Sequence, residues 1–333
     1  MNIQIKYIIL FISLAAIRIS FGQDIHWSQF NDNQIFQNPA NSGNFNGNYR
    51  FIANRRSQWK SVTEPFTTTN ISVDKKFNNN SGFGILFFDD VAGDGKFRTN
   101  ELQINLAYPL KIIKDTNASL KIGVNFGLNH RQVNMDQFNF NNQYNGMTYD
   151  PSLPSNENFD NQKNTNLSIG FGSTYGYKFS KFELLFGTSL FNLNRPNQGF
   201  YNEKIKRDIR SSTFIKSNYF INKLFSLQPS LNVQLQGKYR SMIIGSNLKY
   251  TLSQTPLKYL AIYFGTWLRN KDASIFTIGA DYQNWFFGLS YDINLSTLTP
   301  ASKYRGGSEI AIRYIIRQYK PKKITHRICP DYL

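Results

Sequence analysis

Side chains that commonly carry catalysis or bind metals are scarce in this chain. Its 333 residues include three histidines, His26, His130 and His326, and one cysteine, Cys329. A single cysteine can form neither an intramolecular disulfide nor a cysteine-based zinc cluster. A Ser-His-acid hydrolase needs a histidine within hydrogen-bond reach of its nucleophile, and no histidine falls inside the strands expected below. We therefore expect no enzyme: no catalytic residue, no cofactor and no metal site.

One segment partly matches a calcium-binding loop. It runs from Asp90 through Asp94 and Gly95 to Glu101, which stands at the twelfth position. Ala92 occupies a position where an oxygen ligand is required. A hairpin loop built on Asp and Gly turn residues explains the same segment, and we prefer that interpretation.

The main pattern of the chain is alternation of apolar and polar side chains over segments of about ten residues. In one segment Leu120, Ile122, Val124, Phe126 and Leu128 alternate with Lys121, Gly123, Asn125 and Gly127. The segment 285–294 shows the same alternation. Such a strand has one apolar and one polar face. Its repetition from residue 49 to residue 319 predicts an all-β fold, a transmembrane antiparallel β-barrel of an outer membrane.

The composition agrees with a barrel. Aromatic residues make up 16% of the chain, and the membrane-interface girdles of a barrel use such residues. The mean hydropathy is −0.42, which suits a barrel because only alternate strand residues face lipid. No linker rich in Pro, Gly or Ser divides the strands, so we expect one domain.

About fourteen strands are expected, an even number as in single-chain bacterial barrels. They lie at 49–57, 67–76, 82–89, 97–109, 118–129, 166–179, 182–193, 210–221, 225–236, 240–252, 257–268, 273–282, 285–294 and 307–319. The long connections, 131–165, 194–209 and 295–306, all fall at one end of the strands, and the opposite end has only short turns. Outer-membrane barrels place short turns in the periplasm and long loops outside the cell.

Segments at both ends lie outside the barrel of residues 49–319. Residues 1–22 are expected to be a signal peptide, because Lys6 precedes an apolar run and small residues precede a cut before Gln23. A membrane anchor is the alternative, but the run is shorter than the about 20 residues of a spanning helix. Residues 23–48 form a lead-in segment, periplasmic or lumenal, and residues 320–333 form a basic tail. The tail is either a solvated extension or a docking segment for an acidic partner.

The net charge of +17 does not predict nucleic-acid binding. Nucleic-acid-binding proteins gather Lys and Arg on one face or one tail, whereas here these residues are spread over strands and loops. Charge on the inner face of a barrel, or near acidic lipid head groups, needs no nucleic-acid partner.

Motifs near both ends resemble one family. The motifs are Ser28-Gln29-Phe30, Asn38-Pro39-Ala40-Asn41-Ser42-Gly43, Arg55-Arg56-Ser57-Gln58-Trp59, Ser290-Tyr291-Asp292-Ile293-Asn294 with Arg305-Gly306-Gly307-Ser308-Glu309, and Arg327-Ile328-Cys329-Pro330. Their order is similar to that of the PorP/SprF family, outer-membrane proteins of the type IX secretion and gliding-motility apparatus. The chain departs from the usual family opening at Asp24-Ile25, at Phe30 and at Ala40-Asn41-Ser42-Gly43. These departures concern the subfamily and not membership of the family.

The resemblance singles out seven positions: Asn38, Pro39, Gln58, Trp59, Arg327, Cys329 and Pro330. Asn38-Pro39 is turn chemistry, and the small residues after it allow a tight fold, either inside the barrel mouth or in an ordinary lead-in. Trp59 is expected to be an interfacial anchor rather than a ligand contact. Cys329 is expected to be a packed or free thiol rather than a redox site.

Two functional classes follow. The resemblance implies a non-enzymatic barrel that supports type IX secretion or retains a large secreted protein at the cell surface, by binding its C-terminal sorting domain or the secretion machinery. The alternative is a general porin or small-solute channel, which an amphipathic barrel permits equally.

The connection 131–165 is the expected contact with a partner protein. It is long, rich in Asn and Gln, and carries aromatic side chains, a composition suited to protein binding. The candidate contact residues are Phe138, Phe140, Tyr144, Tyr149 and Phe159. The alternative is a lid that folds over its own barrel.

Overall fold

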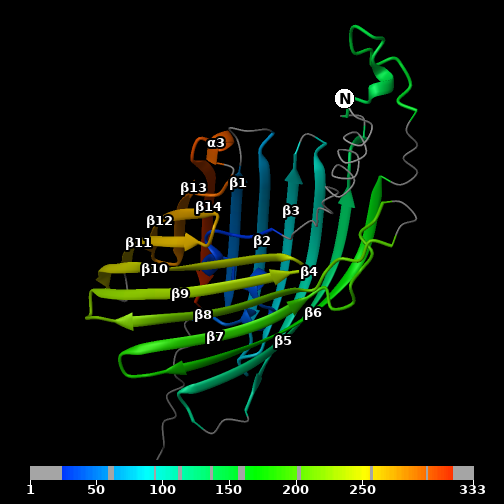
Figure 1. Cartoon of the computed structure of the whole chain (residues 1–333). Helices are drawn as coiled ribbons and strands as arrows, with labels where there is room; N and C mark the ends of the chain where they lie inside the picture. Colours follow the sequence, from blue (N-terminus) through cyan, green and yellow to red (C-terminus); the bar gives the residue numbers. More distant parts are fainter. Residues whose placement is uncertain are drawn as a thin grey trace, which may run out of the picture.

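Fourteen antiparallel strands form a closed barrel in the computed structural model (Figure 1). The structure describes residues 25–58, 64–93, 95–111, 115–135, 138–156, 162–200, 204–255, 258–297 and 299–317. The strands are β1 (Tyr49–Gln58), β2 (Phe66–Lys76), β3 (Gly82–Ala92), β4 (Phe97–Leu110), β5 (Ala118–Gln132), β6 (Lys163–Lys178), β7 (Phe182–Phe191), β8 (Arg210–Phe220), β9 (Phe225–Gln236), β10 (Tyr239–Gln254), β11 (Tyr259–Arg269), β12 (Ala273–Tyr282), β13 (Trp285–Asn294) and β14 (Arg305–Ile316).

Each strand pairs with its neighbours in sequence, and β1 pairs with β14 to close the barrel. The predicted fold class and strand number are confirmed. The ends differ from the expected ones by only a few residues, as where β6 begins at Lys163 rather than at 166. Because β5 extends to Gln132, His130 lies within it and contacts the hydroxyl of Thr165 at 2.7 Å.

The two faces of the wall are as the alternation predicted. Phe126 is 51% exposed and Leu289 is 53% exposed on the outside, whereas Asn125, which faces the lumen, is 1% exposed. Aromatic side chains gather where strands meet the short turns: the rings of Phe179 and Phe182 are 4.1 Å apart, and those of Trp285 and Tyr314 are 4.4 Å apart. This is the arrangement of an interfacial girdle.

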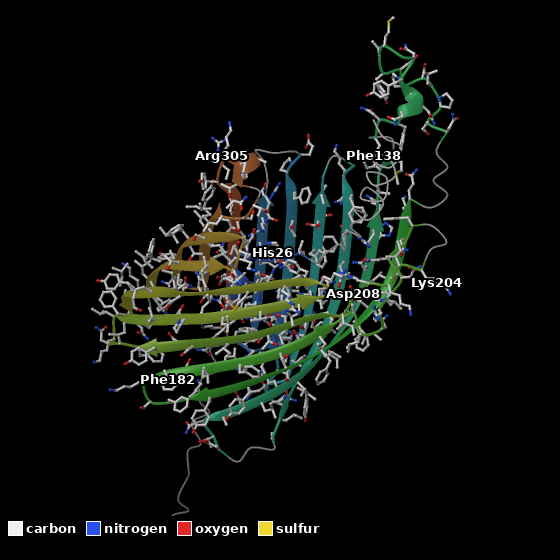
Figure 2. The ribbon with its side chains drawn as sticks, viewed as in Figure 1. His26, Phe138, Phe182, Lys204, Asp208 and Arg305 are labelled. Carbon is white, nitrogen blue, oxygen red and sulfur yellow. The ribbon has the colours of Figure 1, made fainter. Side chains whose placement is uncertain are left out.

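The barrel has a long-loop end and a short-turn end. The connections 133–162 and 192–209 are at the long-loop end, together with α3 (Thr299–Ser302) between β13 and β14. The β5–β6 connection, which includes the 3₁₀ turn η4 (Asn141–Gln143), projects beyond the wall in Figure 1. Figure 2 shows Phe138 and Arg305 at the long-loop end and Phe182 at the opposite end. Among the described residues, no helix is long and apolar enough to cross a membrane.

The lead-in segment lies inside the lumen. It contains the 3₁₀ turn η1 (Phe30–Asp32), the short helix α2 (Gln34–Gln37) and the 3₁₀ turn η2 (Pro39–Asn41). Most of its side chains are buried against the barrel wall, as Phe36 and Asn38 are. We call residues 25–46 the plug. Of the two placements left open by the sequence, periplasmic and lumenal, the structure has the lumenal one.

Labelling can test the assignment of the two ends. In a Cys329→Ser background, cysteines at Met147 and Lys204 should react with an impermeant thiol reagent on whole cells, because both positions are exposed at the long-loop end. Cysteines at Asn79 and Asn222, exposed in short turns, should react only after the outer membrane is opened. Labelling of all four on intact cells would contradict this topology.

The lipid-facing assignment predicts the effect of a charge on the outer wall. Leu289 lies in the middle of β13 with its side chain outward, so Leu289→Arg should lower the free energy of unfolding by roughly 2–4 kcal/mol near the bilayer midplane. Leu289→Phe, which keeps an apolar surface, serves as the control. Unfolding by urea in lipid vesicles measures both, and an equal effect of the two substitutions would contradict a lipid-facing Leu289.

Candidate functional site

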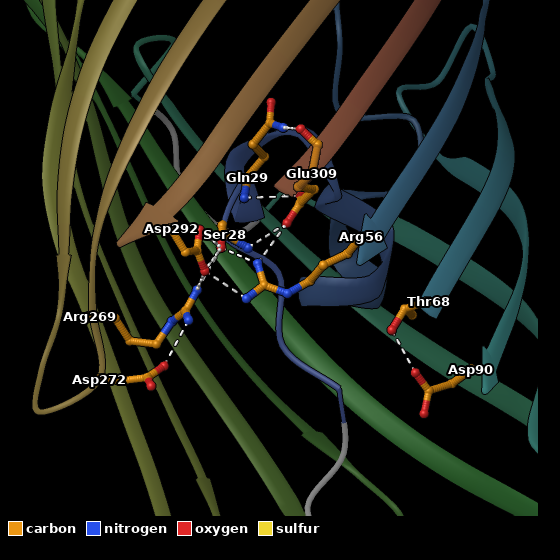
Figure 3. A network of polar contacts seen from close by, with 9 residues as sticks. All are labelled: Ser28, Gln29, Arg56, Thr68, Asp90, Arg269, Asp272, Asp292 and Glu309. Carbon is orange, nitrogen blue, oxygen red and sulfur yellow. Dashed lines mark hydrogen bonds and ion pairs between the residues drawn. The ribbon is translucent and has the colours of Figure 1, made fainter. Parts of the chain in front are cut away.

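An ionic cluster fixes the plug near the long-loop end (Figure 3). Arg56 of β1 pairs with Asp292 of β13 at 2.7 Å and with Glu309 of β14 at 3.2 Å. The hydroxyl of Ser28 in the plug donates to Asp292 at 2.8 Å, and its backbone N–H donates to Glu309 at 2.8 Å. Arg269 of β11 completes the cluster by contacting Ser28 at 2.6 Å and Asp292 at 3.1 Å.

This cluster lies across the seam where the barrel closes. Arg56 and Glu309 are direct cross-strand partners in the β1–β14 ladder, and both side chains are almost completely buried. The adjacent plug residue Gln29 adds two bonds to Glu309, one from its backbone N–H to the carboxylate at 3.1 Å and one from its side-chain amide to the backbone carbonyl at 3.0 Å. Since buried charges need partners, plug and seam stabilise each other.

A second ionic contact fixes the other end of the plug. Arg50 of β1 pairs with Asp74 of β2 at 2.8 Å and donates to the carbonyl of Asn41 at 3.1 Å. The N–H of Gly43 donates to Asp74 at 2.7 Å. Gly43 has a φ of +65°, and a Cβ there would meet the Cα of Gly82 at 2.7 Å, so glycine is required.

The Asn38-Pro39 motif anchors the plug to the wall. The side-chain oxygen of Asn38 accepts from the N–H of Ala40 at 2.9 Å and caps η2. Its amide nitrogen donates to the backbone carbonyls of Ser173 at 3.0 Å and Thr188 at 2.9 Å, on β6 and β7. Gly123 of β5 lies so close to this turn that a Cβ would meet the backbone of Ala40 at 2.3 Å. These residues therefore act in folding and docking of the plug.

Apolar packing fills the space between the ionic contacts. Trp27, Ile35 and Phe36 of the plug pack on Leu86 and Phe88 of β3. On the opposite wall Phe30 packs edge-to-face on Trp267 of β11, with ring centroids 5.4 Å apart, in a second apolar cluster. Asp32 pairs with Arg313 of β14 at 2.8 Å. The plug thus contacts the wall on several sides.

The plug runs the length of the lumen. Ile25 lines a cavity with Gln198 and Arg207 of the β7–β8 connection, at the long-loop end. Asn48, just after the plug, donates to Ile316 and accepts from Lys76, each at 2.8 Å, at the short-turn end. His26 lies inside the barrel (Figure 2), where burial and the nearby Arg269 and Arg56 hold the pKa of its imidazole well below the usual value.

The remaining open space is divided into cavities. One of about 380 Å³ is lined by Asp32 and Asn44 of the plug together with Lys216 and Lys178, toward the short-turn end. A second, also of about 380 Å³, lies at the long-loop end and is lined by Phe36 and by strand residues. We call the second one the mouth cavity.

The expected contact residues of the long connection lie near the tip of the barrel. Phe138 packs on the β3–β4 connection, where a Cβ at Gly95 would meet its ring, and its ring is 6.4 Å from that of Phe140. Tyr144 and Tyr149 form an isolated β-bridge with ring centroids 5.6 Å apart. Phe159 lies outside the described residues. The structure thus pairs four of the five side chains, and their role in binding stays a prediction.

Of the other positions that the family resemblance singled out, some lie within the described residues and some lie outside them. Gln58 lies at the end of β1 and lines the mouth cavity, whereas Trp59, Arg327, Cys329, Pro330, residues 1–22 and the tail from 320 lie outside the described residues.

Carboxylates of the segment that resembles a calcium-binding loop are bonded to protein side chains. Asp90 accepts a bond from Thr68 at 2.6 Å, and Glu101 pairs with Arg207 at 3.2 Å. Asp94 lies outside the described residues. In the described part of the chain, no three His, Cys, Asp or Glu side chains are grouped to hold a metal.

Sequence reasoning did not find the ionic cluster as a unit. Ser28, Arg56, Asp292 and Glu309 all stand in the end motifs, and alternation places the last three on the inner face. Which of them meet depends on barrel closure, which brings β1 beside β14.

Comparison with known proteins identifies the family. Residues 19–314 match the family described as type IX secretion system membrane protein PorP/SprF. The chain belongs to the PorP/SprF family. This PorP/SprF protein is therefore an outer-membrane β-barrel associated with type IX secretion. No curated protein sequence matches it.

Solved structures similar to this PorP/SprF barrel are also outer-membrane barrels. The toluene transporter TbuX of Ralstonia pickettii is 8% identical, with a TM-score of 0.51 over 86% of this chain and 94% of that one. The toluene transporter TodX of Pseudomonas putida is 9% identical, with a TM-score of 0.49 over 87% and 94%. At these identities the likeness concerns the fold alone.

The ionic cluster predicts a large effect of a single substitution. Arg56→Met would leave Glu309 and part of Asp292 buried without their cation, so it should lower the free energy of unfolding by about 3–5 kcal/mol. Arg98→Met is the matched control: its pair with Asp89 is half exposed and should be worth less than about 1 kcal/mol. Urea unfolding in vesicles measures both.

A compensating variant separates charge from packing. Adding Glu309→Gln to Arg56→Met removes one of the stranded charges, so the double variant should recover part of the lost stability. If the double variant is the less stable of the two, uncompensated charge is not the cause.

Proposed function

We propose that this barrel is a non-enzymatic component that supports export of a large secreted protein or retains it at the cell surface. It would do so by binding the C-terminal sorting domain of that protein or a part of the type IX secretion machinery. The family match over residues 19–314 carries the proposal. The plug supports it, because a lumen crossed by a hydrogen-bonded segment suits a receptor or scaffold better than an open pore.

The long β5–β6 connection is the proposed contact surface. It projects from the long-loop end (Figure 1), and the side chains of Tyr144 and Met147 are exposed there. Large aromatic side chains supply much of the binding energy in protein interfaces, and the neighbouring Asn and Gln side chains supply adaptable hydrogen bonds.

The second candidate is a small-solute channel. The two cavities of about 380 Å³ are the observation in its favour. Plug residues line both of them, so a solute path between the two ends requires the plug to move. Deleting the gene distinguishes the candidates: the surface-retention function predicts loss of a secreted protein from the cell surface, and the channel predicts loss of solute uptake.

Loop exchange tests the contact surface directly. Replacing residues 138–149 with a short Gly/Ser linker should leave a heat-modifiable barrel in the outer membrane but release the cognate secreted protein into the medium. The same linker in place of Asn78 to Asn80, at the short-turn end, is the control and should release nothing. Immunoblots of cells and medium give the readout. If the secreted protein stays attached to the cells after the first exchange, this loop is not the contact. The basic tail is then the next candidate.

A further inference from the structure

The outer wall carries a basic groove at the long-loop end. It has a volume of about 380 Å³ and is lined by residues of β3, β4, β5 and β6 and of the connections that adjoin them. Lys96, Arg98 and Lys163 are its basic side chains, and all three are exposed. We call it the rim groove.

Strand register places the rim groove on the lipid side of the barrel. One residue from each of these strands lines it, and neighbours in this row are direct cross-strand partners: Val91, Arg98, Gln132 and Lys163. Four positions away along each strand, or about 13 Å toward the bilayer centre, a second row of partners is apolar and exposed on the outside: Phe87, Leu102, Leu128 and Leu167. Because residues four apart in a strand point to the same face, the first row also faces outward.

The charge of this row is confined to the rim groove. The same row of cross-strand partners continues beyond Val91 through uncharged residues of β2, β1 and β14: Thr67, Ser57 and Ser308. A general attraction to anionic lipids needs no particular grouping of basic residues. Their grouping on β4, β6 and the β3–β4 connection therefore indicates a local ligand.

Two of the three basic groups have no ionic partner among the described residues. Arg98 pairs with Asp89 at 2.5 Å. No described carboxylate forms an ion pair with Lys96 or Lys163. These two ammonium groups are thus available to an anion that enters the groove.

The groove and the surface below it together define the occupant. Side-chain amides of Gln132 and Gln162 line the groove beside the basic groups, and such a mixture of donors suits the oxygens of a phosphate. The apolar row below the groove faces acyl chains, as the rest of the outer wall does. A molecule that contacts both surfaces carries a phosphate head on acyl chains, which is the chemistry of an anionic lipid. The long-loop end places that lipid in the outer leaflet.

We propose that the rim groove binds the phosphate head group of an anionic lipid of the outer leaflet. The phosphate contacts Lys96, Arg98 and Lys163, and the acyl chains lie on the apolar row that includes Leu102 and Leu128. The inference does not depend on the secretion function, because it rests on the wall of the barrel alone. Soluble sugar phosphates share the head-group chemistry, and the test separates the two sources.

The binding experiment uses the full-length protein in a neutral detergent, with diphosphorylated lipid A as the probe. Native mass spectrometry counts the lipid molecules that stay bound, and we expect a retained lipid A whose binding weakens with added salt. The double variant Lys96→Gln/Lys163→Gln should bind it about tenfold more weakly or less tightly still, because two charges near the head group are lost.

Two matched variants separate the groove from general charge and from folding. Lys204→Gln/Lys206→Gln removes the same charge from exposed positions at the long-loop end, outside the groove (Figure 2), and should bind lipid A as the parent does. Lys96→Arg/Lys163→Arg keeps both charges and should also bind as the parent does. Heat-modifiability on gels reports whether each barrel is folded.

The choice of ligand identifies the source of the phosphate. The proposal predicts that dephosphorylated lipid A binds at least about tenfold more weakly, and that glucosamine 1-phosphate, which lacks acyl chains, does not displace lipid A at equal concentration. Displacement at equal concentration would assign the groove to soluble phosphates and overturn the lipid proposal. Equal retention of lipid A by the parent and by Lys96→Gln/Lys163→Gln, or no retained lipid A in the parent, would also overturn it.

Discussion

Burial of charge at the seam is the constraint on which much of this structure depends. A closed barrel joins its first and last strands, and here the joining ladder places Arg56 directly opposite Glu309. Neither charge is accessible to solvent, so each requires partners from inside the lumen. Ser28 and Gln29 supply them for Glu309. The plug is therefore part of the barrel's closure as well as an occupant of its interior.

The same constraint explains why motifs far apart in the sequence act together. Ser28, Arg56, Asp292 and Glu309 come from the beginning and the end of the chain and form one network (Figure 3). Around the wall, Asn38 donates to carbonyls of β6 and β7, while Gly43 is held by Asp74 of β2. The plug thus bridges strands that are distant along the chain.

With the plug inside the lumen, the long-loop end presents two surfaces, the β5–β6 connection and the mouth cavity. The plug contacts the wall at β1, β3, β6 and β14. Both surfaces are aromatic, but they differ in charge: the β5–β6 connection carries mainly amide and aromatic side chains, whereas the mouth cavity carries three arginines.

The sequence alone was sufficient to predict the strands that form the wall of the barrel. Alternation is a local property, because successive side chains of a strand point to opposite faces. Alternation predicted the strands around Phe126 and Leu289 and their lipid-facing side, and the lengths of the connections predicted the asymmetry of the two ends. The end motifs were equally local and indicated the PorP/SprF family, which the match over residues 19–314 confirmed.

Only the tertiary structure decided what the inner face does. Polar residues such as Asn125 give the same alternating pattern whether they face water in the lumen or contact a plug. Residues 25–46 show no alternation that would place them inside the barrel. The pairing of Arg56 with Asp292 and Glu309, and the convergence of Arg131, Arg207 and Arg210 at the mouth, join residues separated by most of the chain or by several strands. Such contacts depend on barrel closure and strand register, which act over the whole molecule and leave no signal in any short segment of the sequence.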